Sequence, residues 1–515
     1  MDTKALRQKI LDLAIRGKLV PQDPNDEPAE VLLERIREQK QQMFKEGKLK
    51  KKDIKNDTII FKGEDNLHYE KFQDGTVKCI EDEIPFEVPE GWAWCKLNDI
   101  YNFIDYRGAT PTKITNGIPL VTAKNVKSGY IDYTIDDYIS EEEFKERQQR
   151  GISKKGDILF TTEAPLGNAA LADMEKFSAG QRLITFQQYG SKNELINYVM
   201  LMFILSDFFQ QQLYVNKTGS TVAGIKAAIL KTLWIPVPPY NEQLRISNTL
   251  KSAINLIDSI SKNKEILSTS ISNTKSKILD LAIRGKIVPQ DPNDEPASVL
   301  LERIRAEKEE LIKQGKIKRD KKESVIFKGD DNSYYGIHLP DSWNWASLRE
   351  IALSISDGSH NPPPNNGSGI PLLSAANIND NSILMNEISR WITNEEWKIE
   401  NQRTNIEVGD VLLTIVGSIG RSAVVQNNNH FALLRSVAVI KPCLINPLYL
   451  MHIVQSPQIQ KWLTDNSKGT AQKGIYLNAL SLMIIPIPPL AEQARIVEHI
   501  HIAYKHLDLI SNALL

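Results

Sequence analysis

The sequence contains little cysteine and no long apolar run. Cys79, Cys95 and Cys443 are the only three cysteines in 515 residues, and none belongs to a CxxC motif. This predicts neither a disulfide framework nor a cysteine metal site. No stretch of about eighteen apolar residues occurs, and the N-terminal MDTKALRQKILDLAIRGK has no signal-peptide core. We therefore expect a cytoplasmic protein that does not cross a membrane.

An excess of charge of one sign is also missing, since 63 basic side chains face 64 acidic ones. Such a chain is not a general polycation, although a nucleic-acid binder needs only one basic face. Lysines gather at Lys45 to Lys55 and at Lys313 to Lys322. Each run is either a solvated linker or a contact to phosphate.

Signatures of catalysis are absent from the sequence. GSTVAGIKA, which begins at Gly219, has Ile225 where a phosphate-binding loop needs lysine. VPPYNEQ has Val237 where the Asn-Pro-Pro-Tyr motif of amino-methyltransferases needs a polar residue. We interpret its prolines as the end of a strand before a long helix that starts near Asn241. No HExxH motif, glycine-rich cofactor fingerprint or nucleophile elbow occurs, and no metal site is predicted among the eight histidines. An autonomous enzyme is therefore not expected.

The sequence does contain an internal repeat. ILDLAIRGKLVPQDPNDEPAEVLLERIR (10–37) returns at 278–305 with changes only opposite Leu19 and Glu30. Further pairs follow in the same order: FKGEDN (61–66) and FKGDDN (327–332), VPEGWAWCKLNDI (88–100) and LPDSWNWASLREI (339–351), GIPLVTAKNV (117–126) and GIPLLSAANI (369–378), GDILFTTEAPLG (156–167) and GDVLLTIVGSIG (409–420), and IPVPPYNEQLRI (235–246) and IPIPPLAEQARI (485–496). The chain therefore consists of two tandem half-molecules.

The two ends of the chain complement each other. When the halves are aligned, Leu515 falls opposite Glu265 and Met1 falls opposite Thr269. The C-terminal and N-terminal segments together thus match the uninterrupted segment in the middle. We interpret this as a closed, pseudo-twofold arrangement in which the chain ends lie within one of two equivalent helical segments.

The middle segment has the period of a coiled coil, with steps of four and three and two polar interruptions. Its seam positions are Ile246, Leu250, Ala253, Ile257, Ile260, Lys264, Leu267, Ile271, Thr274, Ile278 and Leu281. The terminal segments carry matching stripes, so we expect an antiparallel helix pair about 40 residues long, a rod of roughly 60 Å. Alternatively, each stripe packs only on its own globular half.

The repeated segment is predicted to form a helix, a turn and a second helix. Gly17 and Gly285 suit the left-handed position that follows a helix end. The proline-rich KLVPQDPNDEP forms the turn, which we call the duplicated turn (residues 18–28 and 286–296). Asp26 is predicted to cap the next helix, which should continue to Gly47.

Two regions with short β-branched runs, 84–240 and 337–489, lie between these helical parts, and we call them the first and second variable domains. Each is expected to be a mixed α/β or α+β domain with one helix, at Asn193–Leu213 and Asn446–Leu463. Their loops differ sharply: IDYRGATPTKITN (104–116) faces SISDGSHNPPPNNGS (354–368), and NKTGSTVAGIKAA (216–228) faces NSKGTAQKGIYLN (466–478). A shared scaffold with different polar loops suits recognition of two targets, although any single loop can be only a connection.

Together these motifs resemble one family, the specificity (S) subunits of type I restriction-modification enzymes. The resemblance covers essentially the whole chain, through the duplicated AIRGK(L/I)VPQDPNDEPA, the WxW pairs at Trp92 and Trp343, the GIPL and GD(I/V)L pairs and the IPxPPxxEQ helix entries. It implies an α+β fold with two target recognition domains joined by long antiparallel coiled-coil helices. The predicted regions are 1–60 (N-terminal helical), 84–240 and 337–489 (recognition domains), 241–325 (central helical) and 490–515 (C-terminal helix).

The resemblance also implies a function. Each recognition domain would read one half of a bipartite site in double-stranded DNA, and the helices would set the distance between the halves. The helical regions would bind two methyltransferase subunits, which use S-adenosylmethionine, and restriction or motor subunits would add ATP and magnesium. This chain would bind no cofactor and no metal itself and would have no catalytic residues.

Polar side chains in the loops are the candidate DNA contacts, because Arg, Lys, Asn and Gln complement phosphates and base edges. They are Arg107, Thr110, Thr112, Lys113, Lys124, Asn125, Arg182, Lys217 and Ser220 in the first domain, and His360, Asn361, Asn365, Asn366, Asn377, Arg421, Arg435, Lys468, Gln472 and Lys473 in the second. Arg182 and Arg435 are placed at equivalent positions, although an ion pair within the scaffold would explain them equally well. A coiled-coil scaffold that binds proteins and an enzyme with unrecognised motifs remain alternatives.

Overall fold

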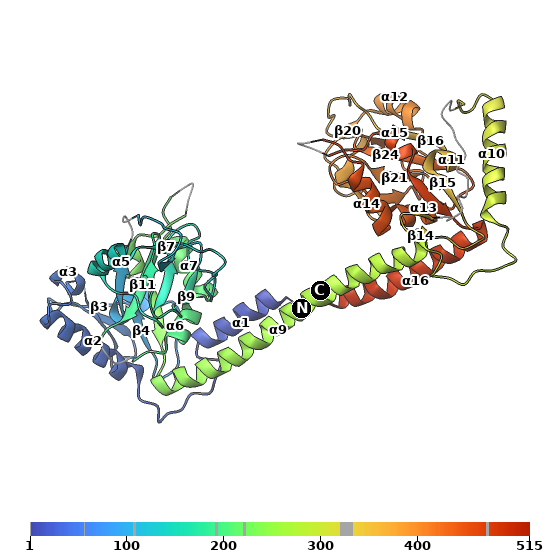
Figure 1. Ribbon diagram of the computed structural model, residues 1–515. Coiled ribbons are helices and arrows are strands. Elements are labelled where there is room, and N and C mark those ends of the chain that lie inside the picture. Colours follow the sequence, from blue (N-terminus) through green and yellow to red (C-terminus); the bar gives the residue numbers. More distant parts are fainter. Residues whose placement is uncertain are drawn as a thin grey trace. The chain divides into compact units, whose positions relative to one another are not determined.

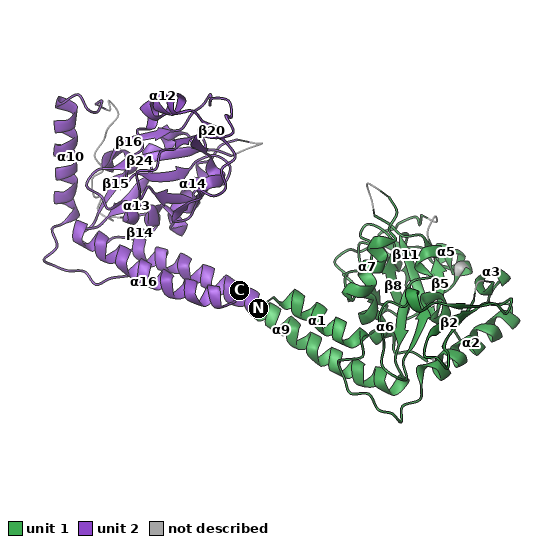
Figure 2. Ribbon diagram, turned by 180° about the vertical axis from the view of Figure 1, so that it is seen from behind, with its two compact units in different colours: residues 1–263 green, residues 264–515 purple. Residues whose placement is uncertain are grey.

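The chain forms two compact units, residues 1–263 and 264–515, which Figure 2 shows in different colours. The computed structural model describes residues 2–55, 57–106, 110–190, 194–219, 223–319, 333–469 and 473–514. Helices and sheets alternate in both units, so the predicted α+β class is confirmed. Within the described ranges, no helix has the length and apolar character that a membrane span requires.

Unit 1 contains the first copy of the repeat and the first variable domain. Its helices are α1 (Thr3–Ile15), α2 (Ala29–Lys45), α3 (Lys51–Ile54), α4 (Leu97–Ile100), α5 (Glu141–Arg147), α6 (Asn197–Ile204), α7 (Asp207–Val215), α8 (Ala227–Leu230) and the first part of α9 (Tyr240–Ile283). Its strands are β1 (Ile59–Lys62), β2 (His68–Lys71), β3 (Val77–Cys79), β4 (Ala93–Lys96), β5 (Tyr101–Asp105), β6 (Ile118–Val121), β7 (Tyr138–Ile139), β8 (Ile158–Thr161), β9 (Ala169–Leu171), β10 (Ser178–Ala179), β11 (Leu183–Gln188) and β12 (Trp234–Val237).

Unit 2 contains the last part of α9, the second copy of the repeat and the second variable domain. Its further helices are α10 (Ala297–Lys313), α11 (Leu348–Ile351), α12 (Asn394–Thr404), α13 (Pro447–Val454), α14 (Pro457–Asp465), α15 (Leu477–Ser481) and α16 (Leu490–Leu514). Its strands are β13 (Ser333–Tyr334), β14 (Ile337–His338), β15 (Asn344–Ser347), β16 (Ala352–Asp357), β17 (Ile370–Leu373), β18 (Ile378–Asn379), β19 (Ser382–Ile383), β20 (Trp391–Ile392), β21 (Val411–Thr414), β22 (Ser422–Val424), β23 (Ala432–Leu433), β24 (Val437–Pro442) and β25 (Ile484–Ile487).

The centre of each variable domain is a four-stranded antiparallel sheet. Its order is β5-β11-β8-β9 in unit 1 and β16-β24-β21-β22 in unit 2. The registers agree, because Leu183 is paired with Thr161 in the first sheet and Val437 with Thr414 in the second. A three-stranded sheet accompanies each, as β10-β6-β7 and β23-β17-β20. The two domains therefore share one scaffold, as the paired motifs predict.

The main core of each unit joins the helices of the repeat to the variable domain. Ile15 of α1 and Trp92, which precedes β4, belong to one buried cluster in unit 1. Ile283 of α9 and Trp343, which precedes β15, belong to the equivalent cluster in unit 2. Burial of such large apolar side chains, about 25 cal/mol for each Å² removed from water, is the main force that fixes the domain on the helices.

In unit 1, α1 lies along the first part of α9 and runs antiparallel to it (Figure 1). Arg7 near the start of α1 forms an ion pair with Asp258, which lies well along α9. Gln22, which follows α1, instead bonds Glu242 in the first turn of α9. Residue numbers therefore rise along α1 where they fall along α9, as in an antiparallel pair.

The same pairing recurs in unit 2 between α16 and the last part of α9. The Lys275 ammonium of α9 lies 2.6 Å from the Asp508 carboxylate near the end of α16. Gln290, which follows α9, bonds Glu492 in the first turn of α16. Each half of α9 therefore has an antiparallel partner helix within its own unit.

The predicted seam on α9 is covered only where a partner helix lies. Ile271 is buried, whereas Leu267 is 39% exposed. With Asp508 opposite Lys275 in an antiparallel pair, the end of α16 at Leu514 falls short of Leu267. Leu267 is therefore left exposed on the seam, because the partner helix ends before it.

The single helix predicted after each central sheet is two helices. Ser206 is the N-cap of α7, where its hydroxyl donates to the Phe203 carbonyl (2.6 Å) and its oxygen accepts the amide of Phe209. Ser456 makes the same bond to the Ile453 carbonyl before α14. Such a serine ends one helix and begins another, which apolar periodicity alone does not reveal.

Substitution of Gly17 should test how tightly the repeat packs on the variable domain. Gly17 has φ +65°, and an added Cβ would lie 2.3 Å from Pro89 Cγ. We expect Gly17→Ala to lower the free energy of unfolding of unit 1 by about 2–4 kcal/mol in urea melts. Gly47→Ala is the matched control, since it has φ +73° but no atom within 4 Å, and should cost about 1 kcal/mol. Equal costs for the two variants would contradict close packing at Gly17.

Candidate functional site

Four segments of the first variable domain meet at one end of its four-stranded sheet. β5 and β8 end there and β11 begins there, because Ile184 is paired with Asp105 and Leu183 with Thr161. The loop after α7 joins them, since Gly224 forms a β-bridge with Glu163. We call this place the loop end of the first domain.

The second variable domain has an equivalent loop end. β16 and β21 end there and β24 begins there, as the pairing of Asp357 with Ala438 shows. Gly474 forms a β-bridge with Val416, and the Gly417 amide donates to the Lys473 carbonyl at 3.2 Å. The two domains thus present different loops from the same position on the same scaffold.

Three predicted contacts of the first domain gather at its loop end. The Gln181 amide donates to the Thr110 hydroxyl, and the next residue, Arg182, lies 3.1 Å from the Glu163 carboxylate. Lys217 stands in the loop that bridges to this end, and its ammonium lies 3.4 Å from the centre of the Tyr214 ring. The side chain of Arg182 is 54% exposed, so it faces solvent despite its ion pair.

Other predicted residues of the first domain lie beside the three-stranded sheet. The Thr112 amide donates to the Glu143 carboxylate of α5, and the Lys113 ammonium lies 2.6 Å from Asp137. Lys124 is exposed in the turn after β6. These exposed side chains form a second group, separate in its contacts from the residues of the loop end.

In the second domain the predicted residues are mostly exposed. Arg435 lies in the turn before β24, where its backbone amide donates a hydrogen bond of 3.0 Å to the Ser359 carbonyl. Arg421, Lys468 and Lys473 are exposed in neighbouring loops. Asn361 is also exposed. His360 follows β16 with its ring nitrogen Nε2 2.7 Å from Asp357.

Two further asparagines of this domain hold the loop that contains them. Asn365 Oδ1 accepts the amides of Gly367 (3.1 Å) and Trp391 (3.0 Å). Asn366 Nδ2 donates to the Ser368 carbonyl at 3.1 Å. Both side chains are exposed, so these bonds leave part of each amide group facing solvent.

Asn125 and Asn377 are placed inside the protein. They are 3% and 4% exposed. The amide of Asn125 donates to the Asp132 and Ile135 carbonyls, and Asn377 donates to the equivalent Glu387 carbonyl at 2.8 Å. A buried amide with its hydrogen bonds made is not available to DNA, so the prediction of DNA contact is not kept for these two residues.

The sheet register corrects one predicted equivalence. Leu183 and Val437 occupy the same position in the two sheets. Arg182 therefore corresponds to Ser436, and Arg435 lies one residue earlier. The loops before these strands differ in length, and alignment of the two sequences alone does not show where the extra residue lies. Arg107, Ser220 and Gln472 lie outside the described residues.

Arg403 and Gln181 also reach the loop ends, although the sequence analysis did not select them. Arg403 lies in the last turn of α12, is half exposed and bonds Asp357. Gln181 contacts Thr110 across the sheet end. Neither belongs to a motif, and only the contact with a residue distant in sequence identifies them. In the described part of the chain, no group of three or more His, Cys, Asp or Glu residues could hold a metal ion.

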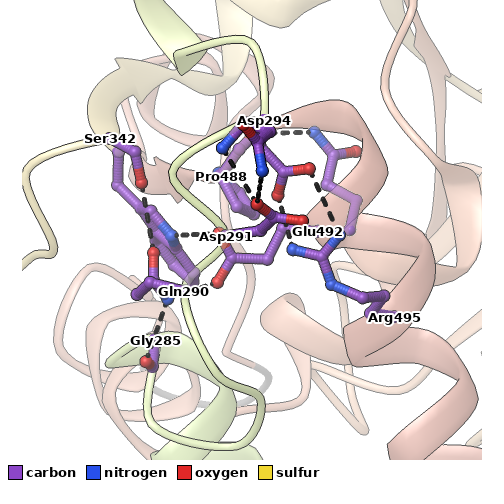
Figure 3. A network of polar contacts seen from close by, with 11 residues as sticks. Gly285, Gln290, Asp291, Asp294, Ser342, Pro488, Glu492 and Arg495 are labelled. Atoms are coloured by element: carbon purple, nitrogen blue, oxygen red, sulfur yellow. Dashed lines mark hydrogen bonds and ion pairs between the residues drawn. The ribbon is translucent and has the colours of Figure 1, made fainter.

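The duplicated turn is fastened to the long helix by a polar network in each unit, shown for unit 2 in Figure 3. Glu492 accepts the Trp343 indole N–H at 2.9 Å and the Gln290 amide at 2.5 Å. Gln290 also donates to the Gly285 carbonyl, and Arg495 forms an ion pair with Asp294. The Glu492 carboxylate thereby joins the start of α16, the duplicated turn and the variable domain.

The same network occurs in unit 1 around Glu242. It accepts from Trp92 Nε1 (2.9 Å) and Gln22 Nε2 (3.1 Å), and Arg245 forms an ion pair with Asp26. Glu242 is 1% exposed, and burial raises the pKa of its carboxyl group. The prediction that Asp26 caps α2 is wrong, because its carboxylate is held by Arg245 and the N-cap position is Pro28.

Known proteins resemble the chain over both units. The family model for the type I restriction modification DNA specificity domain matches residues 89–268 and 340–514. The EcoEI specificity subunit of a type I restriction enzyme from Escherichia coli is 28% identical over 99% of this chain and 90% of that protein. The EcoAI specificity subunit from the same species is 30% identical over 73% of this chain and 67% of that protein.

A solved structure also shares the fold. It comes from work on complex assembly and conformational transition of the type I R-M system, with a TM-score of 0.55 and 18% identity over 84% of this chain and 94% of that one. At this identity the likeness concerns the fold alone.

Removal of the Glu242 carboxylate should loosen unit 1. We expect Glu242→Ala to lower its free energy of unfolding by about 2–4 kcal/mol, because the buried indole N–H of Trp92 is left without its acceptor. Glu310→Ala, which removes only a bond to Gln314 on an exposed helix face, should change stability by less than about 0.5 kcal/mol. Urea unfolding followed by tryptophan fluorescence measures both, and equal effects would contradict the role given to Glu242.

Proposed function

Since the chain belongs to the type I restriction-modification DNA specificity family, we propose that its two variable domains each read one half of a bipartite DNA site. The observation that carries this proposal is the pair of loop ends. Both arise from the same sheet register, yet one presents Arg182 and Lys217 and the other presents His360 and Arg435. Different cationic side chains on one scaffold suit different base sequences.

The helices would set the distance between the two half-sites. α9 contains 44 residues, which at about 1.5 Å per residue correspond to a length of roughly 66 Å. The antiparallel partner helix within each unit supports a coiled coil along each of the two halves of α9. We propose a pseudo-twofold arrangement of the units about this helix, in which the chain ends share the place of one interrupted helix.

The duplicated turn is the proposed docking site for two methyltransferase subunits. Its sequence is the same in both units except at Leu19, and equivalent polar networks hold it. Two equal surfaces suit two copies of one partner. In this proposal the partners bring S-adenosylmethionine for methylation, further restriction subunits bring ATP and magnesium, and this chain contributes recognition and assembly without catalysis or a cofactor of its own.

Exchange of one variable domain should change one half of the recognised site. We expect a chain whose residues 84–240 come from a relative to keep the half-site read by the second domain and to acquire a new first half. Mapping of methylated adenines in genomic DNA, with footprinting at several salt concentrations, measures both halves. The reciprocal exchange of residues 337–489 is the matched control. A change in both halves, or in neither, would refute independent reading.

A charge reversal in the duplicated turn should remove one methyltransferase subunit at a time. Lys18 and Lys286 are equivalent and exposed, so Lys18→Glu should lower the occupancy of one site and Lys286→Glu that of the other. The double variant should lower both. Native mass spectrometry of the complexes reports the ratio of subunits. Retention of two partner subunits by the double variant would rule out a role for these lysines in docking.

A further inference from the structure

One buried carboxylate at the second loop end holds two basic side chains. Asp357, the last residue of β16, has a side chain only 9% exposed. Its Oδ2 lies 2.7 Å from His360 Nε2, and its Oδ1 accepts from the Arg403 guanidinium. Arg403 Nε also donates to the Asp357 backbone carbonyl at 2.9 Å. A histidine and an arginine from distant parts of the sequence are thus fixed to one anchor.

Both basic side chains remain accessible to a ligand. The side chain of His360 is 49% exposed and that of Arg403 is 50% exposed. Because Nε2 faces a carboxylate, it carries the proton, and among the described residues Nδ1 has no hydrogen-bond partner. Nδ1 accepts a hydrogen bond when the ring is neutral and donates one when the ring is protonated.

This anchor lies at the loop end that the proposed function assigns to DNA. The Ser359 amide donates to the Leu433 carbonyl, and the Arg435 amide donates to the Ser359 carbonyl. The turn after β16 is thereby tied to the turn before β24. The charged groups placed here are Asp357 from β16, Arg403 from α12, Arg435 from that turn and Lys473 from the loop that bridges to Val416.

The first variable domain provides an internal contrast. Its residues 84–240 contain no histidine. Asp105 occupies the register position of Asp357, since Asp105 is paired with Ile184 and Asp357 with the equivalent Ala438. A histidine-dependent contact is therefore confined to the second domain.

We propose that Asp357 is a positioning residue that holds His360 and Arg403 as a paired contact to acceptor atoms of the second half-site. Protonated His360 donates through Nδ1 to a phosphate oxygen or to guanine O6 or N7, beside the guanidinium of Arg403. Because the contact needs the protonated ring, affinity for the second half-site is higher at lower pH, while affinity for the first half-site, whose domain has no histidine, does not change in this way. This inference rests on the proposed function.

The test uses the full chain with its methyltransferase subunits and a duplex that carries the mapped bipartite site. Fluorescence anisotropy gives the Kd between pH 6 and pH 8.5 at constant salt. We expect the natural chain to bind about ten-fold more tightly at the lower pH. His360→Gln should bind at all pH values with the affinity of the natural chain at pH 8.5. A duplex with a scrambled second half-site should abolish this pH dependence.

Variants of the anchor separate positioning from general stability. Asp357→Asn should lower affinity and flatten the pH profile, and Arg403→Gln, which changes an exposed side chain, should lower affinity while some pH dependence remains. Asp105→Asn is the matched variant in the first domain and should leave the shape of the pH profile unchanged. Lys461→Gln on α14, where the lysine side chain is 76% exposed, controls for loss of charge. Thermal melts confirm that each variant is folded.

The base composition of the duplex identifies the acceptor. A phosphate contact predicts that His360→Gln weakens binding equally for all second half-sites and lowers the salt slope by about 1, whereas a guanine contact predicts a loss at one base pair only. An unchanged pH profile in His360→Gln overturns the inference, as does unchanged affinity in folded Asp357→Asn. If the natural complex instead fails to discriminate the mapped site at any pH, the proposed function itself is wrong.

Discussion

A buried carboxylate that accepts an indole N–H fixes the geometry in which the apolar core of each unit joins the helices to the variable domain. Glu242 and Glu492 stand in the first turn of the helices that follow the variable domains, and each joins a tryptophan of that domain to a glutamine of the duplicated turn. A buried carboxylate is stable only when donors satisfy it, so the three segments are held in one geometry. The direction in which a long helix leaves its variable domain depends on this contact.

Constancy at the junction allows variation at the loop ends. The four-stranded sheets keep the same register, as Leu183 and Val437 show, while the loops between their strands differ in length and charge. A loop at the end of a fixed sheet can change without disturbing the core, because its side chains face solvent. The near identity of the duplicated turn and the divergence of the loops are therefore compatible within a single chain.

For much of the site, the sequence predicted which loops contribute to it but not which side chains in those loops are accessible. The paired motifs placed Thr110, Arg182 and Lys217 in loops that do meet, since strand order follows the repeat. They also selected Asn125 and Asn377, because the sequence does not distinguish an asparagine that binds a ligand from one that binds the protein backbone. Arg403 was missed for the opposite reason: its contact with Asp357 joins segments that are distant in sequence.

The sequence by itself determined the tandem organisation, the α+β class, the long helix, the turn after Gly17 and the family. Repeats, apolar periods and glycines at helix ends are local properties of the sequence, so they can be recognised without knowledge of which segments pack together. Only the tertiary structure decided that Asp26 pairs with Arg245 instead of capping α2, and that Asp357 holds His360 beside Arg403. Such contacts depend on which strands and helices come to lie side by side, and that is settled by packing of the whole unit.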